Sequence, residues 1–333
     1  MVEYISTFTT GFSVLIPKAL AKLLPGSRIL KVYDGLVNYC YDGKEEDIEK
    51  VFLFNNSFLV IRKYQGGDCE LNSMTKNIIS IKRLPASSKT FRVRYSVNNQ
   101  FVSIDKSFTR KIEENIFRLT KAKIDRVNPQ TEYWFIKRSE NIGFFCRLLN
   151  KRKHTEKDLN KGELRPELAY LICMLGELSK DSTVLDPFVG YGSIPKQIKK
   201  HFPYKKILAS DLSSSRIEEL ERKFRKDKNV QVAVRDALDM QDIITSSIDA
   251  IITDPPWGYY EDIGDMELFY KNMLREFCRV LKDNGMIVIL SARKSEFETA
   301  SADLNLRLHK RIDTLVNGKK AAVYLLRKNS CSV

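Results

Sequence analysis

The chain has 333 residues, with 56 Lys or Arg against 42 Asp or Glu, which gives a net charge of +14. This length exceeds what one ordinary core holds, so two or three domains are expected. No apolar run reaches the roughly 18 residues of a transmembrane helix, and the sequence after Met1 lacks a secretion signal, which favours a cytoplasmic protein without a membrane partner. Six scattered cysteines and three histidines predict no metal site.

Residues 1–64 alternate short strand and helix patterns in the order of a small α+β ferredoxin-like domain. Asp34-Gly35 is typical of a tight hairpin turn, and it separates two strand patterns. In chain order we expect a strand over 4–8, a helix over 16–24, strands over 29–33 and 36–40, an amphipathic stretch over 45–52 and a strand over 58–61.

The excess of basic residues lies in the first half of the chain. Residues 1–165 hold 30 basic and 18 acidic residues, whereas residues 166–333 hold 26 and 24. This asymmetry favours a surface for nucleic-acid phosphates in the first half. Over 65–150 we expect a strand at 90–95, a helix at 107–120, strands at 132–137 and 142–149, and core positions at Trp134, Phe144 and Phe145. The candidate phosphate contacts are Arg92, Arg94, Arg110, Lys111, Lys121, Lys123, Arg126 and Arg147.

Residues 151–165 are polar and charged, and they predict a linker. From residue 166 to 333 strands and helices alternate, which predicts a mostly parallel sheet with helices on both faces, as in a Rossmann-like domain. Besides the strands discussed below, we expect helices at 166–178 and 266–281 and strands at 285–290, 306–312 and 321–326.

A Gly-x-Gly turn follows the first strand of this domain. The strand ends in Asp186, and Gly190 and Gly192 then allow the backbone to approach a ligand where a Cβ would collide. Pro195 stands where the dinucleotide fingerprint needs its third glycine, and no Gly-Lys-Ser/Thr of a phosphate loop follows. The turn therefore suits a cofactor without a pyrophosphate, such as S-adenosylmethionine.

The next two strands also end in acids. Asp211 is placed to bind ribose hydroxyls, and Asp236 to accept from an adenine amino group. Each aspartate alone could be a helix cap or turn residue, but acids after successive strands favour a class I methyltransferase domain. The predicted cofactor site comprises Asp186, Phe188, Gly190, Gly192, Asp211, Asp236 and Ala237.

Asp254, Pro255, Pro256 and Trp257 follow the apolar strand 248–252 and form the candidate catalytic segment. Proline donates no N–H, so nearby carbonyls stay free to accept from the exocyclic amine of a nucleobase. Asp254 would accept a proton of that amine, and Trp257 would stack on the base. The simpler alternative is that the two prolines end a strand and that Trp257 belongs to the core.

The segments 186–195 and 254–258 together resemble the THUMP-containing RNA guanine-N2 methyltransferases, and the resemblance is strong over about residues 160–290. The lead-in at 161–169 and the segment 127–129 also resemble this family. The resemblance implies a ferredoxin-like domain, a THUMP RNA-binding domain over 65–150, S-adenosylmethionine as cofactor and tRNA as partner. Some members of the family also need a small activating protein.

Two positions depart from the family pattern. The first motif of the family usually reads Thr-Ile-Pro-x-Glu, where this chain has Ser193 and Gln197. Trp257 stands where the family more often has Tyr or Phe, which leaves the choice of target base open.

The leading hypothesis is methylation of a tRNA guanosine at N2. The alternatives are adenine-N6 or cytosine-N4 methylation of DNA or other RNA, and a tRNA-binding module with a decayed catalytic half. The sequence leaves open the modified position, mono- versus dimethylation, the need for an activating partner and the oligomeric state.

Overall fold

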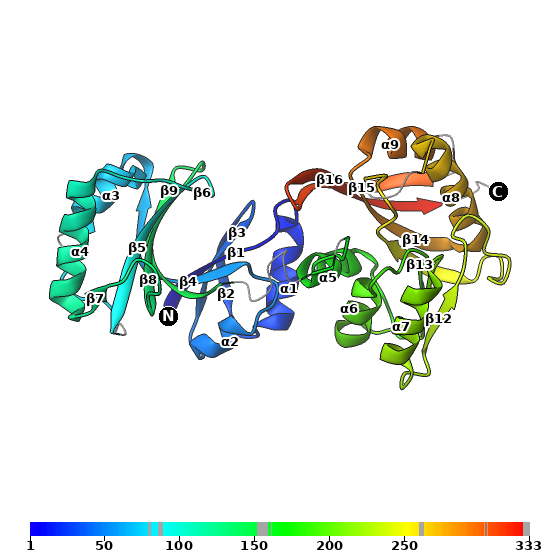
Figure 1. Ribbon diagram of the computed structural model, residues 1–333, viewed down its shortest axis with the longest axis horizontal. Helices are drawn as coiled ribbons and strands as arrows, with labels where there is room; N and C mark the ends of the chain where they lie inside the picture. Colours follow the sequence, from blue (N-terminus) through cyan, green and yellow to red (C-terminus); the bar gives the residue numbers. More distant parts are fainter. Residues whose placement is uncertain are drawn as a thin grey trace. The chain divides into compact units, whose positions relative to one another are not determined.

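The computed structural model describes residues 1–78, 81–85, 89–151, 159–160, 162–259, 263–302, 304 and 306–328. The chain divides into two compact units (Figure 1). The first unit comprises residues 1–8 and 16–152, and the second comprises residues 9–15 and 153–333. No helix among the described residues is long and apolar enough to cross a membrane.

The first unit is built on one sheet with the strand order β2-β3-β1-β4-β9-β8-β5-β6, and β7 pairs with β5. The predicted hairpin is confirmed, because Tyr33 pairs with Leu36 and Gly35 adopts a φ of +76° between them. The strands are β1 (Val2–Thr7), β2 (Arg28–Tyr33), β3 (Leu36–Tyr41), β4 (Asn56–Gln65), β5 (Thr90–Val97), β6 (Gln100–Phe101), β7 (Lys123–Ile124), β8 (Thr131–Arg138) and β9 (Ile142–Lys151).

This sheet runs through both segments that the sequence divides at residue 64. Strand β4 pairs antiparallel with β9, from Asn56 opposite Lys151 to Gln65 opposite Ile142. The ferredoxin-like and THUMP segments thus share one continuous set of backbone hydrogen bonds. The division into 1–64 and 65–150 stays a prediction.

The helices of the first unit are α1 (Ile16–Leu23), α2 (Glu45–Glu49), α3 (Leu71–Ile78) and α4 (Lys106–Thr120). Helices α3 and α4 cover one face of the sheet, where Ile112 and Ile116 belong to the same apolar core as Phe91 and Phe145. Trp134 belongs to a separate core that includes Phe144, so the predicted core positions are confirmed.

The second unit has the strand order β12-β11-β10-β13-β14-β16-β15. Its first five strands pair in parallel, and β16 runs antiparallel to both neighbours, which confirms the predicted mostly parallel sheet. The strands are β10 (Thr183–Asp186), β11 (Lys206–Asp211), β12 (Val230–Val234), β13 (Ile248–Thr253), β14 (Leu281–Ser291), β15 (Leu306–Val316) and β16 (Lys319–Lys328).

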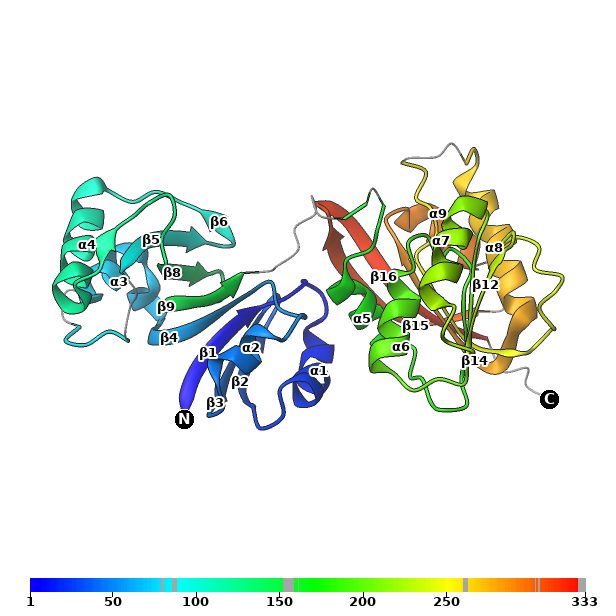
Figure 2. The same cartoon turned by 60° about the horizontal axis from the view of Figure 1, so that its bottom comes forward.

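Helices cover both faces of this sheet (Figure 2). Helices α5 (Pro166–Leu175), α6 (Ser193–His201) and α7 (Ser214–Phe224) lie on one face, and α8 (Met266–Val280) and α9 (Lys294–Ala302) lie on the other. Helix α5 ends earlier than predicted because the chain turns at Glu177, whose φ is +45°. Residues 9–15 also belong to this unit, and the Thr314 hydroxyl donates to the carbonyl of Thr10 at 2.8 Å.

Candidate active site

The strand order of the second unit reverses between β10 and β13. From β10 the chain proceeds outward through β11 and β12, whereas β14 lies on the other side of β13. Ligands of open α/β sheets bind at such a switch point, outside the carboxyl ends of the strands. The four predicted acids gather along this edge, because each stands at or just after the carboxyl end of a parallel strand. They are Asp186 (β10), Asp211 (β11), Asp236 (β12) and Asp254 (β13).

Asp186 is the most buried of these acids, with 1% of its surface exposed. The Thr253 hydroxyl donates to Asp186 Oδ1 at 2.8 Å. The pKa of Asp186 is raised to about 7, chiefly by burial and also by the nearby Asp211 carboxylate, while the bonds from Thr253 and from the Phe188 N–H act in the opposite direction. Asp186 is therefore a buried acid that is held in place at the switch point.

Asp211 organises the glycine turn. Its Oδ2 accepts the Gly190 N–H at 2.9 Å, and its Oδ1 accepts the Ser213 N–H at 3.0 Å. Gly190 has a φ of +49°, and a Cβ built there would meet nothing within 4 Å, so this position borders open space. Gly192 has a φ of +79°, but a Cβ there would lie 2.7 Å from Leu220 Cδ2, so this glycine allows close packing on α7.

The carboxyl end of β12 is more exposed to solvent than those of β10 and β11. Asp236 is exposed, and its Oδ1 accepts the Leu238 N–H at 2.9 Å. Leu212, directly after Asp211, is 68% exposed although it is a large apolar residue. The sequence analysis did not select Leu212. The signal that could have found it is an apolar residue placed directly after the acid that ends a strand. Ala237 is buried beside Asp236.

These residues fit S-adenosylmethionine. Two carboxylates can accept from hydroxyls and an amino group, an apolar side chain can cover a flat ring, and Gly190 leaves space for the ligand. Phe188 is half-buried, and its ring lies 6.0 Å from that of Phe269, between the glycine turn and α8.

Asp254 and Trp257 contact each other. The Trp257 indole N–H donates to Asp254 Oδ1 at 3.0 Å, and both residues are half-buried. The pKa of Asp254 is raised to about 8, chiefly by burial and also by the nearby Asp186, whereas the bond from Trp257 acts to lower it. Pro255 is buried and Pro256 is half-buried between them. The segment thus presents a carboxylate with a displaced pKa beside an aromatic ring.

Helix α8 brings a further group that sequence reasoning missed. Tyr270 is fully buried, and its hydroxyl lies 3.0 Å from Ser291 Oγ at the end of β14. The Asp254 charge is one of the causes that raise the pKa of Tyr270 to about 12, after burial. No periodic pattern in α8 distinguishes this tyrosine from an ordinary core residue.

The structure divides the basic candidates of the first unit between two faces of its sheet. Phe91 and Val93 pack toward α4, so Arg92 and Arg94 point to the opposite face. Both arginines bind the buried Glu132, at 2.8 and 3.3 Å. The candidates on or just after α4 are all exposed, and they are Arg110, Lys111, Lys121 and Lys123.

The two remaining basic candidates pair with glutamates. Arg126 binds both carboxylate oxygens of Glu113, at 2.9 and 2.7 Å. Arg147 binds both oxygens of Glu45, at 2.7 and 2.9 Å, which joins β9 to α2.

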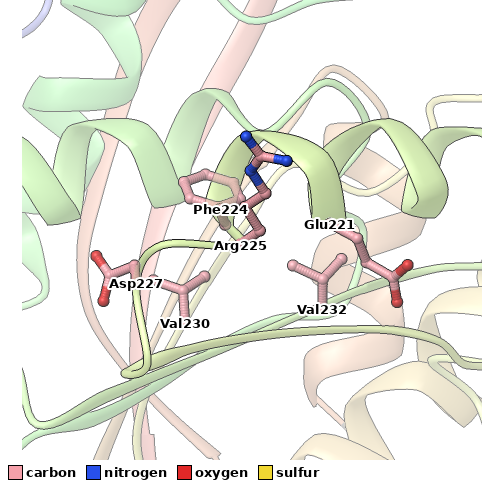
Figure 3. Close-up of a pocket in the computed structure, with 6 residues that line it drawn as sticks. All are labelled: Glu221, Phe224, Arg225, Asp227, Val230 and Val232. Carbon is pink, nitrogen blue, oxygen red and sulfur yellow. The ribbon is translucent and has the colours of Figure 1, made fainter.

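A surface hollow of about 260 Å³ lies at the amino-terminal end of β12, at the opposite end of the strand from Asp236 (Figure 3). Asp227 lines it, but its carboxylate already binds Lys199 at 3.2 Å and accepts from Tyr204 at 3.2 Å. We therefore assign no ligand to this hollow. Its lining residues are Glu221, Phe224, Arg225, Asp227, Val230 and Val232.

Comparison with known proteins gives one family match and several relatives. Residues 196–321 match the family described as RMKL-like, methyltransferase domain. The chain is 29% identical over 156 residues to the tRNA (guanine(10)-N2)-dimethyltransferase of Methanocaldococcus jannaschii, covering 44% of this chain and 43% of that protein. It is also 29% identical over 134 residues to the U6 snRNA (guanine-N(2))-methyltransferase THUMPD2 of Bos taurus, covering 38% of this chain and 25% of that protein.

The chain therefore spans less than half the length of these curated relatives. Among solved structures it is similar to TrmN from Thermus thermophilus, with a TM-score of 0.79, 20% identity and coverage of 98% of this chain and 100% of the other. This similarity shows that the two proteins share a fold along almost their whole length. Together the family match and the two curated relatives confirm the predicted resemblance to the THUMP-containing RNA methyltransferases, and residues 196–321 of the second unit are similar to the RMKL-like methyltransferase domain.

Proposed function

We propose that this protein is an S-adenosylmethionine-dependent RNA methyltransferase that methylates the exocyclic N2 of a guanosine in tRNA. The observation that carries the proposal is the position of Asp254. Its half-buried carboxylate follows β13 at the strand-order switch, beside two prolines and the Trp257 ring. This arrangement supplies acceptors and an aromatic surface where a planar base amine can enter.

The cofactor would bind along the strand ends next to Asp254. S-adenosylmethionine supplies an electrophilic methyl group carried on a sulfonium. Asp211 would accept from the ribose hydroxyls and Asp236 from the adenine amino group, while Leu212 and Ala237 would contact the ring. Phe188, Gly190 and Gly192 would border the methionine part, next to Asp186 at the switch point.

The contribution of this chain's own residues to the reaction is to orient the amine of the target base. The lone pair of such an amine is delocalised into the ring, which makes the nitrogen a poor nucleophile. Ionised Asp254, together with a carbonyl near Pro255, would accept hydrogen bonds from the two N–H groups of the amine and turn the lone pair toward the methyl carbon. Asp254 would then take the released proton. Trp257 would stack on the base, which contributes roughly 1–3 kcal/mol.

The first unit would hold the RNA. The relatives of the chain include a tRNA enzyme and a U6 snRNA enzyme, and the excess of positive charge lies in the first half of the chain. We propose Arg92, Arg94, Arg110, Lys111, Lys121 and Lys123 as phosphate contacts. The division into a ferredoxin-like segment (1–64), a THUMP segment (65–150), a linker (151–165) and a catalytic domain (166–333) belongs to the same proposal. We also propose that the protein works in the cytoplasm.

The test is methyl transfer from labelled S-adenosylmethionine to unmodified tRNA transcripts and to U6 snRNA, followed by nucleoside analysis. The matched variant is Asp254→Asn, because the amide keeps an oxygen that can accept the Trp257 N–H. Label in N2-methylguanosine of tRNA, lost in the variant, supports the proposal. Label confined to U6 snRNA, or found in adenosine or cytidine, would refute the proposed substrate.

A further inference from the structure

The bond between Trp257 and Asp254 occupies one of the two oxygens on the candidate catalytic carboxylate. The indole N–H donates to Oδ1 at 3.0 Å. Pro255 and Pro256 separate the two residues, and their rings fix φ, so the chain between donor and acceptor has little freedom. A carboxylate accepts on both oxygens, which leaves Oδ2 for a second donor.

Tryptophan is the aromatic residue that suits this bond. Phenylalanine has no donor, and tyrosine carries its hydroxyl at the far end of the ring, whereas the indole N–H lies at the side of the ring. The Trp257 ring also makes an edge contact with the Tyr259 ring, at 6.3 Å and 76° between planes. Lys319 Nζ lies 3.4 Å from the centre of the Tyr259 ring, so a neighbouring cation supports this aromatic pair.

We propose that Trp257 is a positioning residue whose N–H holds the Asp254 carboxylate by Oδ1, so that Oδ2 faces the amine of the target base. This inference rests on the proposed function and adds a second role to Trp257 besides stacking. The bond fixes the rotation of the carboxylate, and it favours the ionised form that can accept a proton.

The surroundings of Asp254 explain why such a donor matters. Asp186 from β10 places a second carboxyl group nearby, and Tyr270 from α8 also interacts with Asp254. Arg293 and Glu296 act on Tyr270 from the segment that follows β14. Among the groups that shift the pKa of Asp254, the Trp257 N–H is the one that favours ionisation.

The first experiment measures how methyl transfer by the full chain depends on pH, and it compares the wild type with Trp257→Phe. The variant keeps a ring but loses the donor. We expect the acidic limb of kcat/KM to move upward by about one pH unit, with activity about tenfold lower below it and largely recovered above it. A loss that is equal at every pH would mean that the ring only packs or stacks, and it would overturn the proposal.

Trp134→Phe is the matched control. The chain has two tryptophans, and Trp134 also donates its N–H to a carboxylate, Glu132 Oε2 at 3.0 Å, in the first unit. The same substitution there should leave the position of the acidic limb unchanged. A shift of the limb in this control would also overturn the proposal, because the effect would not depend on Asp254.

The second experiment needs no RNA and no cofactor. Protonation of a carboxylate that accepts an indole N–H changes the charge beside that indole, and so changes its fluorescence. We expect a fluorescence transition near pH 8 in the wild type that both Asp254→Asn and Trp257→Phe abolish. A wild type whose fluorescence shows no pH-dependent change at any pH, or a change that survives in either variant, would contradict the bond. If the transition is present but no RNA is methylated, the proposed function fails while the bond stands.

Discussion

The Thr253 hydroxyl donates a hydrogen bond to Asp186 Oδ1 across 2.8 Å, between the last residues of the neighbouring strands β13 and β10. Both residues are buried, with 0% and 1% of their surfaces exposed. The bond thus ties the two strand ends on either side of the switch point. It also connects the residue before Asp254 to the acid that begins the glycine turn.

Thr253→Val should destabilise the second unit, because it removes the donor and leaves a buried carboxyl oxygen without this partner. The expected loss is about 1–3 kcal/mol of unfolding free energy. The loss should be larger at pH 9 than at pH 5, since a hydroxyl binds a carboxylate more strongly than a carboxylic acid. Urea unfolding at both pH values measures it. Thr253→Ser keeps the hydroxyl and should retain most of the stability, and an equal loss in both variants would contradict this account.

The raised pKa values of Asp186 and Asp254, about 7 and about 8, predict that stability falls as the pH rises. The folded protein keeps protons that the unfolded chain releases in the ordinary carboxyl range. This contribution is complete below the unfolded pKa, and it is lost as the pH rises through the two folded values.

Asp254→Asn isolates part of this effect, because the amide does not titrate. Between pH 5 and pH 9 the cofactor-free wild type should lose more unfolding free energy than the variant, by at least about 1.4 kcal/mol, the equivalent of one pKa unit. Denaturant unfolding at a series of pH values provides the measurement. Parallel curves for the two proteins would mean that Asp254 titrates as an ordinary surface acid.

The row of acids at the carboxyl ends of the parallel strands was largely predictable from the sequence. Apolar strand patterns followed by an acid are local signals, and the parallel arrangement brings their carboxyl ends to one edge, which gathers Asp186, Asp211, Asp236 and Asp254. The partners of these acids were not predictable. The donation of the Gly190 N–H to Asp211 depends on the fine conformation of a turn, which residue identity does not specify.

The sequence also could not predict which strands and side chains that are distant in the chain lie next to each other. Periodicity predicts that β4 and β9 are strands, but it does not say that they pair, and so the continuous sheet of the first unit was not foreseen. The same holds for Gly192, whose missing Cβ makes room for Leu220 from α7. In both cases the deciding neighbour is distant in the sequence.

The two glycines of the turn should respond differently to alanine. Gly190→Ala places a methyl group in open space, so it should weaken S-adenosylmethionine binding, while the left-handed backbone costs only about 1 kcal/mol of stability. Gly192→Ala places its methyl group 2.7 Å from Leu220 Cδ2 and should lower stability more. Calorimetric titration and thermal unfolding separate the two effects. Leu220→Ala added to Gly192→Ala should recover part of the loss, and no recovery would place the cost in the backbone alone.

The exposed lysines on and just after α4 should act on RNA affinity alone. Lys111→Ala, Lys121→Ala and Lys123→Ala combined should weaken tRNA binding and leave the melting temperature unchanged, since all three side chains are exposed. Each lost phosphate contact should reduce the slope of log affinity against log salt by about 0.7–0.9. Filter binding over a salt series gives that slope, and Lys228→Ala, exposed in the second unit, serves as the matched control.

Arg92 should behave differently, because it binds Glu132, which is 7% exposed. Arg92→Ala removes one of the charged partners of that carboxylate and leaves Arg94 and the Trp134 N–H in contact with it, so it should cost about 1–3 kcal/mol of stability in addition to any loss of RNA affinity. Urea unfolding of the variant measures the first effect, and filter binding measures the second. A variant that binds RNA more weakly at unchanged stability would show that Arg92 serves the phosphates directly and that Arg94 suffices for Glu132. Unchanged affinity with lowered stability would instead remove Arg92 from the RNA surface and leave the residues near α4 as the phosphate contacts.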